Sequence, residues 1–296
     1  MNKKLSAAAK REERWGWFMI APTIIGLVVL NLWPFVQTLY SSFCEHLGFG
    51  HYKFIGLQNY KDMFGNTEFW KATWNTVYFC ILTVPVGIAL ALLVALLLNA
   101  HVKFKGGFRT IFFLPLVCAP AAIAMAWRWI FNTEYGILNQ ILGGKIQWIT
   151  DPKTAVLAVA IVSVWSSIGY DAVLLLAGLQ NIPRSYYEAA MVDGASGWQK
   201  FKSITVPLLS PVPFYILVTT LIGGFQVFVE VQVMTPSGNG GIGYSAATIV
   251  FYLYQKAFES YQLGYASAIA VILAIIIFII TAINFVGQNK WVKTMD

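Results

Sequence analysis

Charged residues are scarce in this 296-residue chain. Asp, Glu, Lys and Arg make up 11% of the sequence, whereas a soluble domain contains roughly 25%. Hydrophobic residues make up 58%, and several long segments contain no charge at all. These proportions exclude an ordinary soluble domain. The sequence therefore predicts an all-α integral membrane protein.

Cysteine and histidine are also rare. The three cysteines are odd in number and far apart: Cys44, Cys80 and Cys118. This pattern argues against a disulfide framework and against a metal site. The three histidines fall in segments that we expect to be solvated loops: His46, His51 and His101. The sequence therefore predicts no bound metal.

The short motifs of several enzyme classes are missing. The sequence has no GxxxxGK[ST] phosphate loop, no HExxH or CxxC pair, and no GxSxG serine elbow. We therefore predict no catalytic residue and no cofactor bound by this chain. If the protein moves a solute uphill by hydrolysis, a separate chain has to supply the ATPase.

Six segments are long and apolar enough to cross a membrane, which takes about 20 mostly apolar residues. They are residues 17–41, 74–99, 109–131, 155–180, 208–234 and 265–287. We therefore predict six transmembrane helices in one domain, 17–287, between an N-terminal segment, 1–16, and a tail, 288–296. The first apolar segment is long enough to remain as an anchor.

Lys and Arg are distributed unevenly between the two sides that six spans define. Thirteen fall in the N-terminal segment, the second and fourth connections and the tail, whereas six fall in the other three connections. Cytoplasmic loops carry the excess of positive charge in membrane proteins. We therefore expect both termini in the cytoplasm. The formal net charge of +7 reflects this bias and does not indicate a nucleic-acid partner.

A polar segment, residues 181–207, interrupts the apolar runs on the predicted cytoplasmic side. Helix starts and stops in it are indicated by Asn181 as a cap, Pro183, Gly194 and Pro207. They predict two short helices, Ser185–Val192 and Trp198–Thr205, joined at a glycine. Two interpretations are open at this point: a loop that merely links two spans, or a docking element for a soluble partner.

The connections on the other side are longer than minimal turns. They cover about residues 42–73, 132–154 and 235–264, and the last contains a predicted short interfacial helix, 246–259. These loops either receive a partner outside the cytoplasm or only close the outer surface.

Polar side chains inside the predicted spans are candidate functional groups, because they are costly in a membrane. Asp171 lies in the fourth span, roughly 14 Å from its cytoplasmic end at about 1.5 Å per residue. Its neighbours in that span are Ser163, Ser166, Ser167 and Tyr170, and the fifth span adds Thr219, Thr220, Gly223, Gly224, Gln226 and Glu230. Packing between helices is the alternative role for Ser and Thr. For Arg128 and Glu230 we expect snorkelling to the membrane surface.

The polar segment contains one motif with a long, specific spacing. Glu188-Ala189-Ala190 is followed after three residues by Gly194, and after nine more by Ile204 and then Val206-Pro207. This spacing resembles the EAA loop of the permease subunits of binding-protein-dependent ABC importers, with Val206 in place of the usual leucine. Other short segments along most of the chain also resemble segments of these permeases: Phe54 to Tyr60, Leu114-Pro115, Leu179 to Pro183 and Leu263 to Ala268. The chain is similar to permeases of the carbohydrate-uptake class 1 type, such as the maltose and glycerol-phosphate permeases, and to the first of their two subunits.

The resemblance implies an importer complex in a bacterial-type plasma (inner) membrane. In such complexes two homologous permeases form a heterodimer, and two cytoplasmic ATP-binding subunits bind ATP and Mg. An extracytoplasmic solute-binding protein delivers the sugar or oligosaccharide. Transport then proceeds by alternating access, coupled to ATP hydrolysis in the separate subunits.

The resemblance also implies two groups of site residues. The coupling helix that docks on an ATPase would contain Glu188, Ala189, Ala190, Asp193, Gly194, Ala195 and Phe201. Substrate contacts would come from Ser163, Ser166, Ser167, Tyr170, Thr220, Gly224 and Val227, with Asp171 and Gln226 beside them. Several of these positions carry amides in the maltose permease, so the sugar itself stays open.

Two other classes of function remain as alternatives. An ion-coupled secondary transporter or channel would use Asp171 and Glu230 and would need no ATPase. A membrane-embedded enzyme would need a catalytic constellation, and the missing motifs argue against it.

Overall fold

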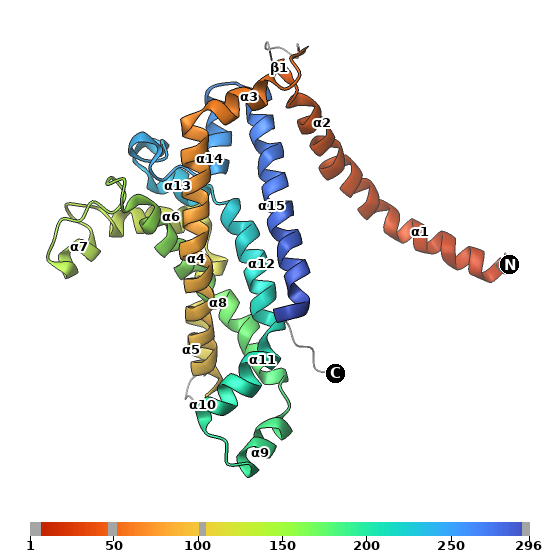
Figure 1. Cartoon of the computed structure of the whole chain (residues 1–296), viewed down its shortest axis with the longest axis vertical. Coiled ribbons are helices and arrows are strands. Elements are labelled where there is room, and N and C mark those ends of the chain that lie inside the picture. The colour runs from red at the N-terminus through yellow and green to blue at the C-terminus, as the bar shows by residue number, and fades with distance from the viewer. Residues whose placement is uncertain (1–6, 47–51, 101–104, 292–296) are drawn as a thin grey trace. The chain divides into compact units, whose positions relative to one another are not determined.

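The computed structural model describes residues 7–46, 52–100 and 105–291 (Figure 1). Parts of the predicted N-terminal segment and tail, as well as His51 and His101, lie outside these ranges. The chain divides into two compact units, one formed by residues 1–63 and 256–271 and the other by residues 64–255 and 272–296.

The first unit combines helices with one small hairpin. It contains α1 (Ala7–Leu27), a π-helical turn (Val28–Leu32), α2 (Trp33–Ser41), β1 (Cys44–His46), β2 (Tyr52–Phe54), most of α3 (Gln58–Gly65), most of a second π-helical turn (Gln255–Glu259) and the start of α15 (Leu263–Trp291). The two strands are antiparallel, with Glu45 opposite Lys53. The side-chain amide of Asn59 donates to the carbonyls of Ser42 and Cys44 at 2.9 and 3.0 Å. This bonding ties α3 to the base of the hairpin.

The second unit is helical within the described ranges. It contains α4 (Thr67–Asn99), α5 (Lys105–Val117), α6 (Pro120–Ile130), α7 (Ile137–Leu142), α8 (Ala155–Asn181), α9 (Arg184–Val192), α10 (Gly197–Lys200), a π-helical turn (Phe201–Thr205), α11 (Val206–Leu209), α12 (Pro211–Phe225), α13 (Val229–Met234), two 3₁₀ turns (Pro236–Gly238 and Ile242–Tyr244), α14 (Ile249–Tyr254) and the rest of α15.

Four of the six predicted spans correspond to helices long and apolar enough to cross a membrane. They are Arg11–Ser41, Thr67–Asn99, Ala155–Asn181 and Leu263–Gln288. The predicted third and fifth spans correspond to helix pairs that are sharply bent, and counting each pair as one span gives six. The helices over 109–131 and 208–234 are therefore discontinuous, and the number of six spans stays a prediction.

The third span breaks at Cys118-Ala119, where α5 and α6 meet at an angle of 100°. Pro120 is the first residue of α6. A residue before proline is pushed away from the helical region, and Ala119 accordingly has φ −62° and ψ 129°. The proline therefore starts a new helix in place of continuing the old one.

The fifth span breaks twice. The helical segment Gly197–Leu209 bends by 57° into Pro211–Phe225, and α12 ends at Phe225 before the short α13. The second break follows Gly223-Gly224, because glycine loses more conformational freedom in a helix than other residues do. The 15 residues of α12 span roughly 22 Å at about 1.5 Å per residue, which is less than a hydrocarbon core of about 30 Å.

The core of the second unit lies between α4 and α8. Ala91 and Ala95 on α4 are fully buried against a cluster that includes Ala172, Leu175 and Leu179 on α8. Small residues let membrane helices approach closely. Further along, an added Cβ on Gly178 would lie 2.7 Å from Leu209 and 2.8 Å from Val212, so α8 also packs tightly against the α11–α12 corner. Figure 1 shows α4, α8 and α12 running alongside one another.

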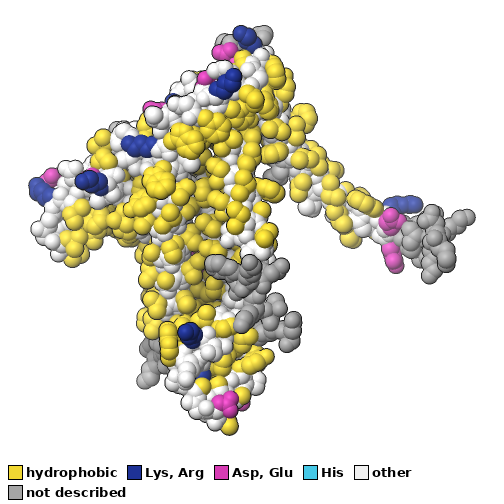
Figure 2. Space-filling model, viewed as in Figure 1, with side chains coloured by type: hydrophobic (Ala, Val, Ile, Leu, Met, Phe, Trp, Pro, Cys, Tyr) yellow, Lys and Arg dark blue, Asp and Glu magenta, His cyan; other side chains and the backbone are white. Residues whose placement is uncertain are grey.

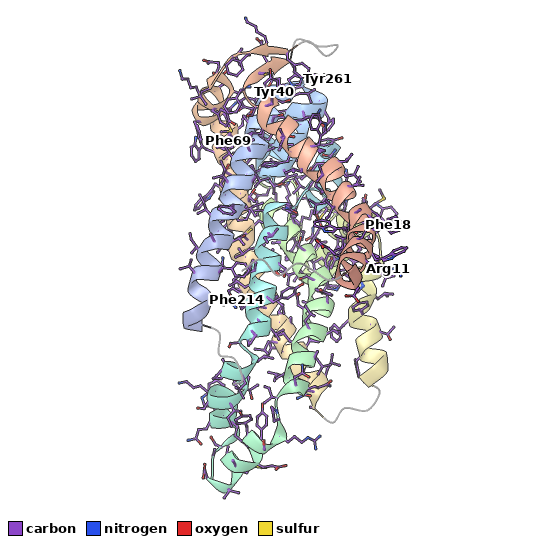
Figure 3. The ribbon with its side chains drawn as sticks, turned by 90° about the vertical axis from the view of Figure 1, so that its right-hand side faces the viewer. Arg11, Phe18, Tyr40, Phe69, Phe214 and Tyr261 are labelled. Carbon is purple, nitrogen blue, oxygen red and sulfur yellow. The ribbon has the colours of Figure 1, made fainter. Side chains whose placement is uncertain are left out.

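Hydrophobic side chains cover the outer sides of these helices. In Figure 2 they extend over the middle of the second unit, while charged side chains gather towards its ends. On α4, Trp74, Ile81 and Leu97 are more than half exposed. Phe214, labelled in Figure 3, lies on α12 and contacts Phe285 of α15 edge to face, with 5.9 Å between ring centroids. A lipid environment satisfies such a surface, whereas water does not.

The end of the second unit opposite α9 and α10 is held by buried hydrogen bonds. The Asn75 amide of α4 donates to the carbonyls of Tyr244 and Ala247 at 2.9 and 3.0 Å. Thr76 accepts from the Ile249 backbone at the start of α14. The predicted segment 246–259 is helical from Ile249 onwards, as α14 and the π-helical turn after it, and its place at a membrane interface stays a prediction.

Candidate functional site

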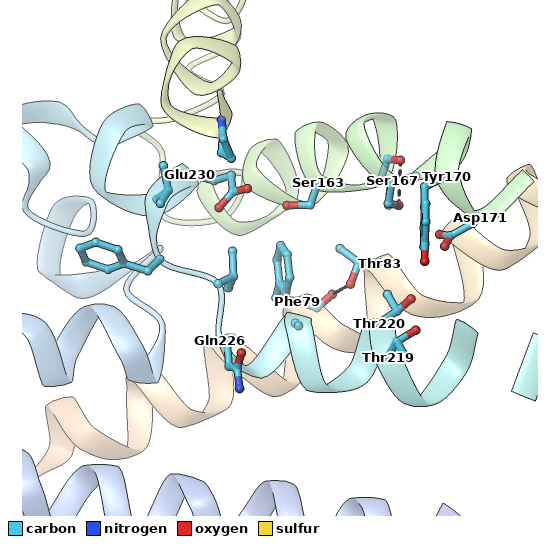
Figure 4. A pocket seen from close by; sticks show the side chains of 17 residues that line it. Phe79, Thr83, Ser163, Ser167, Tyr170, Asp171, Thr219, Thr220, Gln226 and Glu230 are labelled. Atoms are coloured by element: carbon cyan, nitrogen blue, oxygen red, sulfur yellow. Dashed lines mark hydrogen bonds between the residues drawn. The ribbon is translucent and has the colours of Figure 1, made fainter. Parts of the chain in front are cut away.

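A cavity of about 480 Å³ opens between α4, α8, α12 and the break that leads into α13 (Figure 4). Its polar lining consists of Thr83, Ser163, Ser167, Tyr170, Asp171, Thr219, Thr220, Gln226 and Glu230. Its apolar lining consists of Phe79, Pro120, Val164, Gly223, Gly224, Val227, Phe228 and Val229. An apolar wall with a few convergent polar groups is the usual character of a small-molecule site.

The α8 wall of the cavity presents the polar face that the sequence singled out. Ser163, Ser167 and Asp171 recur every four residues, so they share one face of the helix. Asp171 is 5% exposed, and Figure 4 shows it beside Tyr170, with the threonines of α12 opposite. The Ser167 hydroxyl donates to the Val164 carbonyl at 3.2 Å.

The other walls come from α4 and α12. The Thr83 hydroxyl of α4 donates to the carbonyl of Phe79 at 2.9 Å, and both side chains face the cavity (Figure 4). Gly224 is buried where α12 meets α4, and an added Cβ there would lie 2.7 Å from the sulfur of Cys80. Glycine at this position therefore lets α12 approach α4 beside the cavity.

Eight of the nine predicted substrate-pathway residues line this one cavity. They are Ser163, Ser167, Tyr170, Asp171, Thr220, Gly224, Gln226 and Val227. Ser166 does not line it, and its hydroxyl donates to the Val162 carbonyl at 2.9 Å. Contact of any of these residues with a substrate stays a prediction.

Sequence reasoning missed several lining residues. Phe79 and Thr83 carried no signal, because α4 reads as uniformly apolar. Glu230 lines the cavity and is half-buried, because α12 ends at Phe225 and α13 starts close by. The expected snorkelling of Glu230 and Arg128 to the membrane surface stays a prediction. Arg128 donates to the Val233 carbonyl at 3.2 Å, so its guanidinium bonds to α13.

The second candidate site is the polar segment at the end of α8 (Figure 1). Both predicted helices are present, as α9 and as Gly197–Leu209. Asn181 is wrong as a cap, because α8 continues to that residue and Pro183 precedes α9. Pro207 is wrong as a stop, because the helix passes through it into α11, whose first turn tolerates a missing N–H.

The turn between α9 and α10 is built by local hydrogen bonds. The Gly194 N–H donates to the Met191 carbonyl at 3.1 Å, and the Ala195 N–H donates to the Ala190 carbonyl at 2.9 Å. Gly194 has φ +75°. This is the Schellman ending of a helix, which requires a left-handed residue and favours glycine.

A capping box starts the next helix. The Ser196 hydroxyl accepts from the Gln199 N–H at 3.3 Å, and the Gln199 side chain accepts from the Ser196 N–H at 2.7 Å. Phe201 stacks on Trp198 with ring centroids 5.5 Å apart.

One hydrogen bond closes the two arms of the loop. The hydroxyls of Tyr187 on α9 and Thr205 lie 2.9 Å apart, and Thr205 is 6% exposed. The seven predicted coupling residues lie on this framework, where Glu188, Ala189, Asp193 and Gly194 are exposed and Ala190, Ala195 and Phe201 are half-buried. The framework holds an exposed surface that α9, with no buried residue of its own, would not hold alone.

Apolar helices, a polar cavity between them and a rigid exposed loop define a membrane transport permease. The chain belongs to the family of binding-protein-dependent transport system inner membrane components, which matches residues 83–290. It is 36% identical to the probable ABC transporter permease protein YesP of Bacillus subtilis, over 98% of this chain and 95% of that protein. It is 34% identical to the lactose transport system permease protein LacF of Rhizobium radiobacter, over 93% and 94% of the two chains.

The fold also matches that of a solved transporter. The structure of a bacterial alginate ABC transporter, in complex with an alginate pentasaccharide-bound periplasmic protein, contains a chain with a TM-score of 0.83 and 22% identity. The match covers 97% of this chain and 98% of that one. The predicted family is therefore confirmed.

Proposed function

We propose that this chain is one permease subunit of an ATP-driven importer that takes up a sugar or oligosaccharide by alternating access. The family supports the transport role, and the relative whose name specifies lactose supports a sugar as substrate. A second permease, two ATP-binding subunits and an extracytoplasmic solute-binding protein complete the complex. The ATP-binding subunits, not this chain, bind ATP and Mg and hydrolyse the ATP.

The observation that carries the proposal is the way the loop connects the cavity walls. α8 carries Ser163, Ser167 and Asp171 and ends at Asn181, directly before α9. The helix after the loop leads through α11 into α12, which forms the opposite wall. The two walls are therefore the two helices that flank the exposed loop. A rigid displacement of the loop moves both walls of the cavity.

In this proposal the loop from α9 to α11 is the coupling helix that docks on a cytoplasmic ATPase. Ala189 and Gly194 present little side-chain bulk on its exposed surface, which suits insertion into a groove. Glu188 is exposed and would pair with a basic residue of the ATPase. Dimerisation of the ATPases on ATP would displace this loop and switch the cavity between inward-open and outward-open states.

The test is a charge reversal on the loop. The variant Glu188→Lys is expected to insert into the membrane normally but to lose sugar uptake, because the ATPase contact is broken. The matched control is Glu134→Lys, which reverses an exposed carboxylate distant from the loop in sequence. The ATPase subunits should copurify with this control variant. Normal uptake by Glu188→Lys would refute the coupling role. Purification of an active chain without ATPase subunits would favour an ion-coupled transporter.

A further inference from the structure

The charged groups of the cavity are all of one sign. Asp171 and Glu230 face it, and none of its lining residues, all within the described ranges, is Lys, Arg or His. Neither carboxylate has an ion-pair partner among the described residues. Arg128 of α6 is not among the lining residues, and its guanidinium donates to the Val233 carbonyl at 3.2 Å.

The neutral polar groups of the cavity suit a substrate rich in hydroxyls. Thr83, Ser167 and Thr219 present hydroxyl oxygens that can accept hydrogen bonds, while Thr220 and Gln226 add a further hydroxyl and an amide. The carboxylates accept hydrogen bonds and offer no positive charge to an anion. A unit negative charge about 6 Å from one carboxylate is disfavoured roughly 100-fold at an effective dielectric constant of about 20.

We infer that this cavity selects uncharged sugars and excludes sugars that carry carboxylate, phosphate or sulfate groups, with Asp171 and Glu230 as the specificity-determining residues. The inference rests on the proposed function for the identity of the substrate as a sugar. Its electrostatic part concerns the cavity alone and is tested without transport.

The test measures the charge preference of the cavity by thiol labelling. Cys44, Cys80 and Cys118 are replaced by Ala, and Thr220→Cys is introduced in the whole purified complex. Labelling rates are compared for a trimethylammonium-ethyl and a sulfonatoethyl methanethiosulfonate, relative to free mercaptoethanol. We expect the cationic reagent to be favoured at least ~10-fold at this cysteine. The ratio of the cationic to the anionic labelling rate should fall towards the ratio for mercaptoethanol in Asp171→Asn/Glu230→Gln. It should stay unchanged in the control Glu134→Gln.

Equal rates for the two reagents, or a ratio that survives removal of both carboxylates, would overturn the inference. Failure of both these reagents and of neutral methyl methanethiosulfonate to label Thr220→Cys would overturn it too, since no solvent would then reach the cavity. The transport arm compares uptake of cellobiose and cellobiouronic acid. Uptake of the acid as fast as of cellobiose counts against the inference alone, whereas uptake of no sugar with a cation-selective cavity counts against the proposed function alone.

Discussion

Tyr187→Phe removes a hydroxyl that joins the two arms of the loop from α9 to α11. The lost bond measures 2.9 Å and buries the Thr205 hydroxyl. Without Tyr187, the remaining acceptor of Thr205 is the Lys200 carbonyl at 3.5 Å, a weak bond. A neutral hydrogen bond contributes about 1 kcal/mol net, so separation of the arms should become about fivefold more frequent.

The assay is hydrogen exchange in the whole complex, read at the amides of Gly197–Leu209. Protection there should fall about fivefold in Tyr187→Phe, because the fold-change in opening appears directly in the exchange rate. If the loop transmits movement from the ATPases, sugar transported per ATP hydrolysed should fall as well, by up to about the same factor.

A partner variant separates stability from coupling. Thr205→Val leaves the half-buried Tyr187 hydroxyl within reach of water. The double variant Tyr187→Phe/Thr205→Val leaves no buried hydroxyl unsatisfied, and its destabilisation should be less than the sum of the two single effects. Transport per ATP should nevertheless remain low in the double variant, since the arms are still not joined. Unchanged amide exchange in Tyr187→Phe would refute the claim that this bond holds the two arms together. Faster exchange with normal transport per ATP would show that the bond stabilises the loop but does not contribute to coupling.

Three further predictions concern single positions. Gly194→Ala should destabilise the loop by about 1 kcal/mol because of its left-handed backbone, whereas Gly194→Asn should cost less; equal effects on amide exchange would contradict this explanation. Gly224→Ala should lower the thermal stability of the complex through its clash with Cys80, and Cys80→Ala should rescue it; without rescue, the clash is not the cause. Burial lowers the pKa of His46 below its ordinary 6.5, so the hairpin is stabilised at pH values above 6.5 and loses that stability as the pH falls through the lowered pKa. Exchange of the hairpin amides, corrected for intrinsic rates, should be faster at pH 5 than at pH 7.5, and His46→Gln should abolish the difference.

The long helices were predictable because hydrophobic length is a direct requirement of a bilayer. The interval from Lys153 to Arg184, which contains Asp171 as its one charge, predicted the bounds of α8 within a residue, 155–180 against Ala155–Asn181. The loop helices were predictable for a different reason, since glycine and proline have local conformational effects. Gly194 was expected to end the first loop helix, and it follows α9 in a left-handed conformation.

Contacts between distant residues were not predictable from composition or spacing. Tyr187 and Thr205 are 18 positions apart, and neither hydroxyl indicates its partner in the sequence. The hairpin of the first unit has strands of three residues, too short for an alternating pattern to emerge. Thr83 and Phe79 reach the cavity only because α4 packs against α8, and the sequence of α4 alone does not reveal which of its faces does so.

The breaks in the third and fifth predicted spans locate the cavity. Irregular backbone at membrane depth is tolerated where it is buried in protein or lines a water-filled space, and transporters place binding sites at such discontinuous helices. The break before α6 places Pro120 on the cavity, and the break after α12 places Gln226, Val227 and Phe228 there. Hydropathy measures the length of an apolar segment but not the direction of its backbone, so it does not detect either break. The local signals of the two breaks in the sequence are the pairs Ala119-Pro120 and Gly223-Gly224. Pro120, Gly223 and Gly224 line the same cavity as the polar face of α8. A continuous third and fifth span would have left Asp171 facing apolar helices without a solvated cavity, which is the costly arrangement that the breaks avoid.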